Sequence, residues 1–172
     1  MKRFRYYVAM SVDGYIGPPG GRLDWLAPFE HIDVGYAAFE AEIDTVVLGR
    51  ATFDQIAKFD DWPYAGKRAL IWTSSPLDTD IEGVEAFSGD AGELSWKLRR
   101  EGEGDVWIVG GGRTAGAILR AGHLDTVELF VLPVLLGNGI RLFSAGGSEM
   151  ALELVDSKQF GAGIQHLSYT IG

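Results

Sequence analysis

The amino-acid sequence predicts a single-domain α/β fold with a mostly parallel sheet flanked by helices and antiparallel strands at its C-terminal end. Segments typical of strands alternate with segments typical of helices as far as Ala121, and the later strand segments follow one another without a helix between them. The length of 172 residues fits one domain over residues 1–172, and the 47% hydrophobic share is enough for a packed core.

The first elements are marked by apolar runs and by the signals that end them. Phe4–Ser11 is an apolar, β-rich segment that stops at the turn signal Asp13-Gly14. Apolar residues spaced among acids predict an amphipathic helix over Asp33–Ile43. A short strand of the buried type, Thr45–Gly49, follows it.

A helix capped at Thr52 is indicated by Thr52 and Gln55, which have the spacing of a capping box. We expect this helix to run to about Lys58 and to be followed by an apolar strand, Arg68–Thr73. The turn sequence Ser-Ser-Pro then closes that strand.

The next elements repeat the alternation. Val84–Phe87 is a minor strand, and Ala91–Glu101 is a helix that turns two leucines toward the core. Asp105–Val109 is a strand, and three consecutive glycines separate it from a helix over Thr114–Ala121. The remaining predicted strands are Thr126–Val134, Leu152–Ser157 and Ile164–Ile171.

Composition excludes several classes of function. The chain has 24 acidic and 15 basic residues, a net charge of −9, which argues against nucleic acid as a partner. It has no cysteine, so disulfides, thiolate metal sites and cysteine nucleophiles are excluded, and its three scattered histidines make a metal site unexpected. Because no segment is typical of a signal peptide or a membrane span, we expect a cytoplasmic protein that does not bind membranes.

Three segments at the carboxyl ends of predicted strands have features of anion-binding sites. Gly110-Gly111-Gly112 precedes a helix, where free backbone N–H groups and the helix dipole favour a phosphate. Gly49 and Arg50 precede the helix that contains Thr52, and Thr73-Ser74-Ser75 offers three hydroxyls. Each also has a purely structural interpretation, as a tight turn, a capped helix or a turn before Pro76. Three such sites on one sheet edge favour a long ligand with several phosphates.

Four segments in this order resemble the dihydrofolate reductase-like superfamily, and most closely the branch named for the C-terminal reductase domain of the bacterial riboflavin enzyme RibD. The segments are Ala9–Gly17, Val47–Phe53, Val109–Gly112, and Pro133–Gly139 with Leu142-Phe143. The resemblance implies an eight-stranded mixed sheet flanked by helices, with NADPH as the hydride donor.

The resemblance also implies which residues hold the cofactor. Ala9 and Ile16 would line the nicotinamide, and Ser74 and Ser75 would lie near the adenosine 2′-phosphate. The remaining cofactor-binding residues would face the phosphates, and they are Gly49, Arg50, Thr52, Gly110, Gly111, Gly112, Arg113 and Thr114.

Substrate-binding residues are less well defined, because Gly110 stands where RibD-type reductases carry a glutamate. Dihydrofolate reductases use an acid on the first helix, and the same spacing before Gly49 leads to Asp33. A buried carboxylate there would grip a ring and help to protonate it, whereas the alternative is that Asp33 caps its helix. Asp24 is the rival catalytic acid, and Trp25 would either stack on a heteroaromatic substrate or cover the core edge.

The sequence therefore predicts an NADPH-dependent reductase that acts on a C=N bond or sugar imine of a small heteroaromatic molecule. The substrates that the resemblance implies are a phosphoribosylamino-pyrimidine of riboflavin biosynthesis and, as an alternative, a dihydrofolate or pterin. A non-catalytic NADPH-binding module is the competing hypothesis, and the absent glutamate favours it. The apolar edge left by the C-terminal strands predicts a homodimer.

Overall fold

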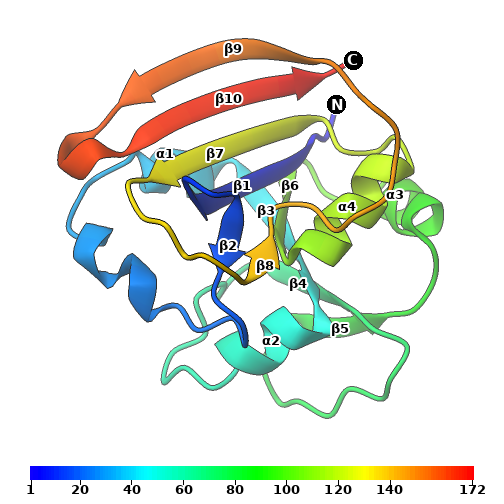
Figure 1. Ribbon diagram of the computed structural model, residues 1–172. Coiled ribbons are helices and arrows are strands. Elements are labelled where there is room, and N and C mark those ends of the chain that lie inside the picture. Colours follow the sequence, from blue (N-terminus) through cyan, green and yellow to red (C-terminus); the bar gives the residue numbers. More distant parts are fainter.

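A computed structural model describes residues 1–172 and contains one eight-stranded sheet (Figure 1). Its strands are β1 (Phe4–Ser11), β3 (Ile43–Gly49), β4 (Arg68–Trp72), β5 (Val84–Phe87), β6 (Asp105–Gly110), β7 (Thr126–Leu132), β9 (Leu152–Gln159) and β10 (Gln165–Ile171). The spatial order is β5-β4-β3-β6-β1-β7-β10-β9. All pairs from β5 to β7 are parallel, and β10 pairs antiparallel with β7 and with β9. The predicted mixed sheet with antiparallel C-terminal strands is confirmed.

Helices cover both faces of the parallel part of the sheet (Figure 1). On one face, α3 (Ala91–Arg99) and α4 (Gly112–Arg120) contribute Leu94, Leu98 and Ile118 to the larger core cluster. On the other face, α1 (Tyr36–Ala41) and α2 (Arg50–Ile56) contribute Phe39 and Phe53 to the second cluster. Burial on both faces explains why β3, β4 and β6 are continuous apolar runs.

The helix predicted over Asp33–Ile43 is wrong at both ends. Asp33 accepts a hydrogen bond from the backbone N–H of Gly35 at 2.9 Å, and Gly35 adopts a left-handed conformation with φ of 80° before the helix begins at Tyr36. At the other end, Ile43 pairs with Asp105 as the first residue of β3. The competition for backbone hydrogen bonds within the sheet therefore shortens the helix to six residues.

Short elements that the sequence did not predict shape the rim of the sheet. β2 (Tyr15–Gly17) pairs antiparallel with β8 (Ile140–Arg141) to form a separate ribbon below β1 (Figure 1). Two 3-10 helices, η1 (Asp24–Phe29) and η2 (Gly161–Gly163), complete the chain. No helix is both long enough and apolar enough to cross a lipid bilayer.

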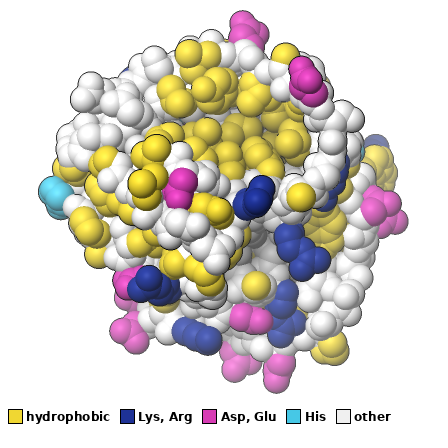
Figure 2. All heavy atoms as spheres, in the orientation of Figure 1, with side chains coloured by type: hydrophobic (Ala, Val, Ile, Leu, Met, Phe, Trp, Pro, Cys, Tyr) yellow, Lys and Arg dark blue, Asp and Glu magenta, His cyan; other side chains and the backbone are white.

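The C-terminal edge of the sheet leaves apolar side chains uncovered. All eight residues of β9 are exposed, and among them Leu154 and Val155 each keep 53% of their surface accessible. Figure 2 shows hydrophobic side chains gathered over the upper part of the molecule, where β7, β9 and β10 lie in Figure 1. The predicted homodimer would cover such a surface, and it stays a prediction.

Ion pairs hold together the amino ends of the parallel strands. The buried guanidinium of Arg5 donates to both carboxylate oxygens of Glu128, at 2.7 and 2.9 Å, and also pairs with Glu42. Arg3 donates to Asp105 at 2.9 Å, and this bond holds the pKa of Asp105 below its usual value although burial alone would raise it. These contacts tie β1, β6 and β7 to one another and to the end of α1.

Candidate active site

Glycines at the carboxyl ends of β3 and β6 allow two neighbouring strands and a helix to converge. A Cβ atom on Gly49 would lie 2.6 Å from the hydroxyl oxygen of Thr114, so a side chain here would displace that hydroxyl. Gly110 ends β6 with φ of 136°, a conformation that side chains rarely adopt, and its peptide bond to Gly111 is cis. The backbone path into α4 therefore requires glycine at position 110.

Gly112 has a different role from the other glycines of the triplet. A Cβ atom on it would collide with the carbonyl oxygen of Arg141, and the carbonyl of Gly112 accepts a hydrogen bond from the N–H of Ser144 at 3.1 Å. The segment that follows β8 thus packs directly on the first turn of α4. The side of Gly112 where a side chain would project is closed by protein backbone, whereas Gly111 lines a cavity.

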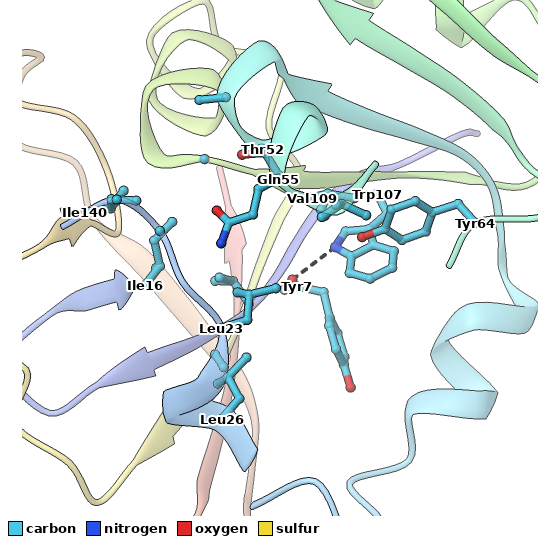
Figure 3. A pocket seen from close by; sticks show the side chains of 17 residues that line it. Tyr7, Ile16, Leu23, Leu26, Thr52, Gln55, Tyr64, Trp107, Val109 and Ile140 are labelled. Atoms are coloured by element: carbon cyan, nitrogen blue, oxygen red, sulfur yellow. Dashed lines mark hydrogen bonds between the residues drawn. The ribbon is translucent and has the colours of Figure 1, made fainter. Parts of the chain in front are cut away.

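This cavity has a volume of about 440 Å³ and lies at the carboxyl ends of β1 and β6, under α2 (Figure 3). Twelve of its seventeen lining residues are hydrophobic, and none carries a charge. Four of the predicted cofactor-binding residues meet here, namely Ala9, Ile16, Thr52 and Gly111. The remaining walls are formed by Tyr7, Val8, Gly20, Gly21, Leu23, Leu26, Ala51, Gln55, Ile56, Tyr64, Trp107, Val109 and Ile140.

The capping box predicted from Thr52 and Gln55 is wrong. Gly49 is the N-cap residue of α2, and no side chain caps this helix. Thr52 and Gln55 instead lie three residues apart on one face of α2, and both line the cavity. A capping box and a pair of side chains on one helix face both have a spacing of three residues. The sequence alone therefore does not distinguish a capping role from a position in the cavity wall.

A second, more polar hollow of about 390 Å³ lies between the end of β4 and the start of α4. The structure brings together in it Ser74, Arg113 and Thr114, three of the predicted cofactor-binding residues, whereas Ser75 does not line it. Arg120 adds a second guanidinium, and neither arginine forms an ion pair with a carboxylate. Figure 2 shows Lys and Arg side chains gathered beside the hollowed part of this face.

The start of α4 joins the two hollows. Gly111 lines the apolar cavity, and Arg113 and Thr114, in the first turn of the nine-residue helix, line the polar hollow. First-turn N–H groups of a helix lack partners within the helix and carry partial positive charge. An extended molecule with one flat apolar end and a phosphate-rich remainder fits this arrangement.

Arg50 lies outside both sets of lining residues. Its guanidinium donates to Asp54 at 2.9 Å and to the carbonyl of Pro76 at 3.0 Å, and the side chain is about one-third exposed. It is therefore already paired in this structure, whereas Arg113 has no ion pair. Its expected contact with a cofactor phosphate stays a prediction.

Neither predicted catalytic acid lies in the cavity wall. Asp33 is exposed and bonds to the backbone of Gly35, so the prediction of a buried carboxylate at this position is wrong. Its alternative as a helix cap is also wrong, because Gly35 caps α1. Asp24 is exposed too, and it pairs with Arg22 at 3.0 Å. The bend at Gly35 keeps Asp33 at the surface.

Trp25 packs against the small core cluster of Phe130, Leu132 and Ile164. Its indole nitrogen is buried without a hydrogen-bond partner, and the residue does not line the cavity. This position agrees with the alternative in which Trp25 covers the core edge. No group of three or more potential metal ligands is found together.

Asp13 holds the rim of the cavity. Its carboxylate accepts hydrogen bonds from the backbone N–H groups of Leu136 and Gly137, at 3.1 and 2.7 Å. A further hydrogen bond from the Ser11 hydroxyl contributes most to lowering the pKa of Asp13 below its ordinary value. The hydrogen bonds from Leu136 and Gly137 connect the loop that leads to β2 with the loop that leads to β8. Ile16 in β2 and Ile140 in β8 both line the cavity.

Sequence reasoning missed two polar groups that line the cavity, the Gln55 amide and the Tyr64 hydroxyl. The spacing of Gln55 from Thr52 is that of a capping box, and this spacing conceals its position in the cavity wall. Tyr64 lies in the loop between α2 and β4, where no periodicity marks a buried residue. It is nevertheless only 5% exposed, because Trp62 and Trp107 pack edge-on against its ring.

Comparisons with known proteins agree with this geometry. Residues 78–166, just over half of the chain, match the RibD C-terminal domain family. YwjB of Bacillus subtilis strain 168, a protein of uncharacterised function, is 35% identical over 161 residues, which is 92% of each chain.

Two solved structures share the fold. A candidate riboflavin biosynthesis protein from Shewanella sp. PV-4 superposes with a TM-score of 0.88 at 26% identity over 99% of both chains. Dihydrofolate reductase from Enterococcus faecalis, in complex with NADP(H) and RAB-propyl, superposes with a TM-score of 0.65 at 20% identity over 99% of this chain and 96% of that one. The predicted resemblance is confirmed: the chain belongs to the RibD C-terminal domain family and has a dihydrofolate reductase-like fold.

Proposed function

We propose that this protein is an NADPH-dependent reductase of a small heteroaromatic substrate. The observation that carries the proposal is the pair of hollows joined by the start of α4, one apolar and one lined by hydroxyls and two arginines without carboxylate partners. A nicotinamide ring suits the first hollow and a phosphate chain suits the second. Bound NADPH would supply a hydride to the substrate.

The residues present fit that cofactor. The first-turn N–H groups of α4 and the guanidinium of Arg113 offer donors to a pyrophosphate, and Ser74 offers a hydroxyl at the far side of the polar hollow. Membership of the RibD C-terminal domain family supports a reductase, and the Enterococcus faecalis reductase of the same fold binds NADP(H). Family membership and the Enterococcus faecalis reductase are evidence from related proteins. The two hollows are the evidence from this chain itself.

The work left to the protein is positioning and the exclusion of water. The side chains of Ile16, Leu23 and Ile140 close one side of the cavity, and Trp107 and Val109 close another (Figure 3). When the nicotinamide ring and the substrate ring are held face to face in this cavity, their reaction becomes effectively intramolecular. The entropy of bringing the two rings together has then already been lost on binding. The apolar walls also keep water from competing for the hydride acceptor.

The substrates proposed are a phosphoribosylamino-pyrimidine of riboflavin biosynthesis, as the resemblance to RibD-type reductases implies, or a dihydropterin. A second candidate function, a non-catalytic NADPH-binding module, is favoured by one observation: no carboxylate lines the cavity, and both Asp24 and Asp33 face solvent. Steady-state oxidation of NADPH with each substrate separates the two. Turnover with either substrate supports the reductase, and tight NADPH binding without turnover supports the module.

Arg113→Met tests the phosphate contact directly. Loss of a charge-assisted hydrogen bond should weaken NADPH binding about tenfold, measured by calorimetric titration, while the unfolding transition stays where it is. Lys158→Met on β9, which removes a cation far from both hollows, is the matched control and should leave NADPH affinity unchanged. Equal affinities for NADPH in the wild-type protein and in Arg113→Met would contradict this contact.

A further inference from the structure

We propose that the apolar cavity selects an uncharged ring with a lactam-type edge, that is, an adjacent N–H and C=O, which Gln55 and Tyr64 recognise. This inference rests on the proposed function and narrows its substrate class to rings that bring no phosphate or carboxylate into the cavity. It assigns substrate specificity to two side chains that lie outside the family motifs of this chain.

The first support is the absence of charge from the cavity wall. None of the lining residues is acidic or basic, and the two predicted catalytic acids, Asp24 and Asp33, are exposed and bond to other groups. A phosphate or carboxylate that entered would lose its hydration and gain no counter-charge, which is strongly unfavourable. A neutral ring loses little, because the walls are apolar and match its faces.

The second support is the position of the Gln55 amide. The side chain extends from α2 into the cavity, between Ile16 and Leu23 on one side and Trp107 on the other (Figure 3). It makes no hydrogen bond to another lining residue, since the one such bond drawn joins the Trp107 indole to the carbonyl of Tyr7 at 3.0 Å. An amide offers one acceptor and two donors, so a lactam edge can pair with it through two hydrogen bonds.

Gly21, in the loop after β2, has no side chain and so leaves space for the Gln55 amide. A Cβ atom on Gly21 would lie 2.7 Å from the Gln55 amide oxygen and 3.3 Å from Ile140. Gly21 also has φ of 73°, which favours glycine for the backbone as well. Any side chain here would push the Gln55 amide out of its place.

Tyr64 supplies a further donor from the opposite wall. In Figure 3 its hydroxyl points toward the cavity, whereas the hydroxyl of Tyr7 points away from it. The ring of Tyr64 is fixed between Trp62 and Trp107, with ring centres 5.2 and 5.4 Å away. Burial raises the pKa of Tyr64, so the hydroxyl keeps its proton at neutral pH and donates to a carbonyl of the ligand.

Calorimetric titration of the full chain with three related compounds tests the proposal, with and without saturating NADPH. The probes are the bicyclic lactam quinazolinone, its N-methyl derivative, which lacks the lactam N–H, and a carboxylate derivative. We expect quinazolinone to bind best, the N-methyl derivative about tenfold more weakly because one hydrogen bond is lost, and the carboxylate at least about 100-fold more weakly.

Gln55→Met keeps the length of the side chain and removes its hydrogen bonds, so the preference for quinazolinone over the N-methyl derivative should disappear. Tyr64→Phe should weaken both neutral compounds by a similar factor of about five to ten. Gln159→Met, on the exposed strand β9, is the matched control and should retain the wild-type preference.

The proposal is overturned if quinazolinone does not bind, if the carboxylate binds as tightly, or if Gln55→Met retains the preference. Titration of the same preparations with NADPH alone reports on the proposed function separately. Failure to bind NADPH contradicts the reductase without changing the preference among the three probes, and a lost preference with intact NADPH binding contradicts the specificity proposal alone.

Discussion

The two ends of the parallel strands are built in opposite ways. At the amino ends, charged side chains from three strands and from the residues that flank them pair with one another, and Arg5 and Glu128 are buried in the process. At the carboxyl ends, Gly49 and Gly110 replace side chains with space, and the cavity beside them carries no charge. One end of the sheet is therefore closed by electrostatic contacts, and the other is open to a cavity.

Under the proposed function, stability and binding are placed at separate ends of the same strands. Removing a partner from a buried ion pair leaves an uncompensated charge, so the amino ends tolerate little change. The ion pair at the carboxyl ends, Arg50 with Asp54, is solvent-exposed, and the glycines there instead allow α4 and the strands to approach closely. Substitutions at one end should thus change the free energy of unfolding, and substitutions at the other should change ligand affinity.

The largest expected effect is that of Arg5→Met at the closed end. Glu128 would keep its buried carboxylate without the two hydrogen bonds from Arg5, and we expect the free energy of unfolding to fall by about 3 kcal/mol. Urea denaturation measures this change. The NADPH affinity of the folded fraction should stay the same. A loss of NADPH affinity together with the loss of stability would contradict the claim that the two ends have separate roles.

A smaller loss is expected from Gly112→Ala at the open end. The new methyl group would collide with the Arg141 carbonyl, so the segment after β8 must move away from α4, at a cost of about 1–3 kcal/mol. Because α4 carries the proposed phosphate donors, NADPH affinity should fall as well. Gly161→Ala is the control, since its methyl group would meet only the flexible end of Ile32 at 3.2 Å. Unchanged affinity in Gly112→Ala would contradict this account.

The smallest effect concerns acid pH. The pKa values of Asp44 and Asp105 are lowered in the folded protein, in each case because hydrogen bonds outweigh an opposing effect of burial. A lowered pKa stabilises the fold at pH above the ordinary value of 3.8, and this contribution is lost as the pH falls through the lowered pKa values. Urea midpoints between pH 7 and pH 3 should show that loss, and Asp105→Asn should reduce the slope. An identical slope in the variant would argue against this origin.

Much of the fold could be predicted because its signals are local. The strands are short apolar runs bounded by turn residues, and their order along the chain decides which pairs are parallel. The placement of Ser74, Arg113 and Thr114 in one hollow follows from the same rule, since carboxyl ends of parallel strands lie on one edge.

The remaining site residues depend on tertiary contacts that no local pattern encodes. Asp33 faces solvent because the chain turns at Gly35, and the spacing to Gly49 does not reveal that turn. Gln55 had the spacing of a cap, and only the packing of α2 on the sheet shows that it lines the cavity. Tyr64 is buried by two tryptophans that are 2 and 43 residues away in the sequence, as the numbering of Trp62 and Trp107 shows.

The most direct test of the central claim is calorimetric titration of the folded wild-type protein with NADPH and, separately, with NADH. The account predicts micromolar binding of NADPH and weaker binding of NADH, because the additional 2′-phosphate meets the hydroxyls and arginines of the polar hollow. Absence of heat with both nucleotides, from protein shown to be folded by its unfolding transition, would contradict the account. The glycine triplet would then serve only the backbone path into α4.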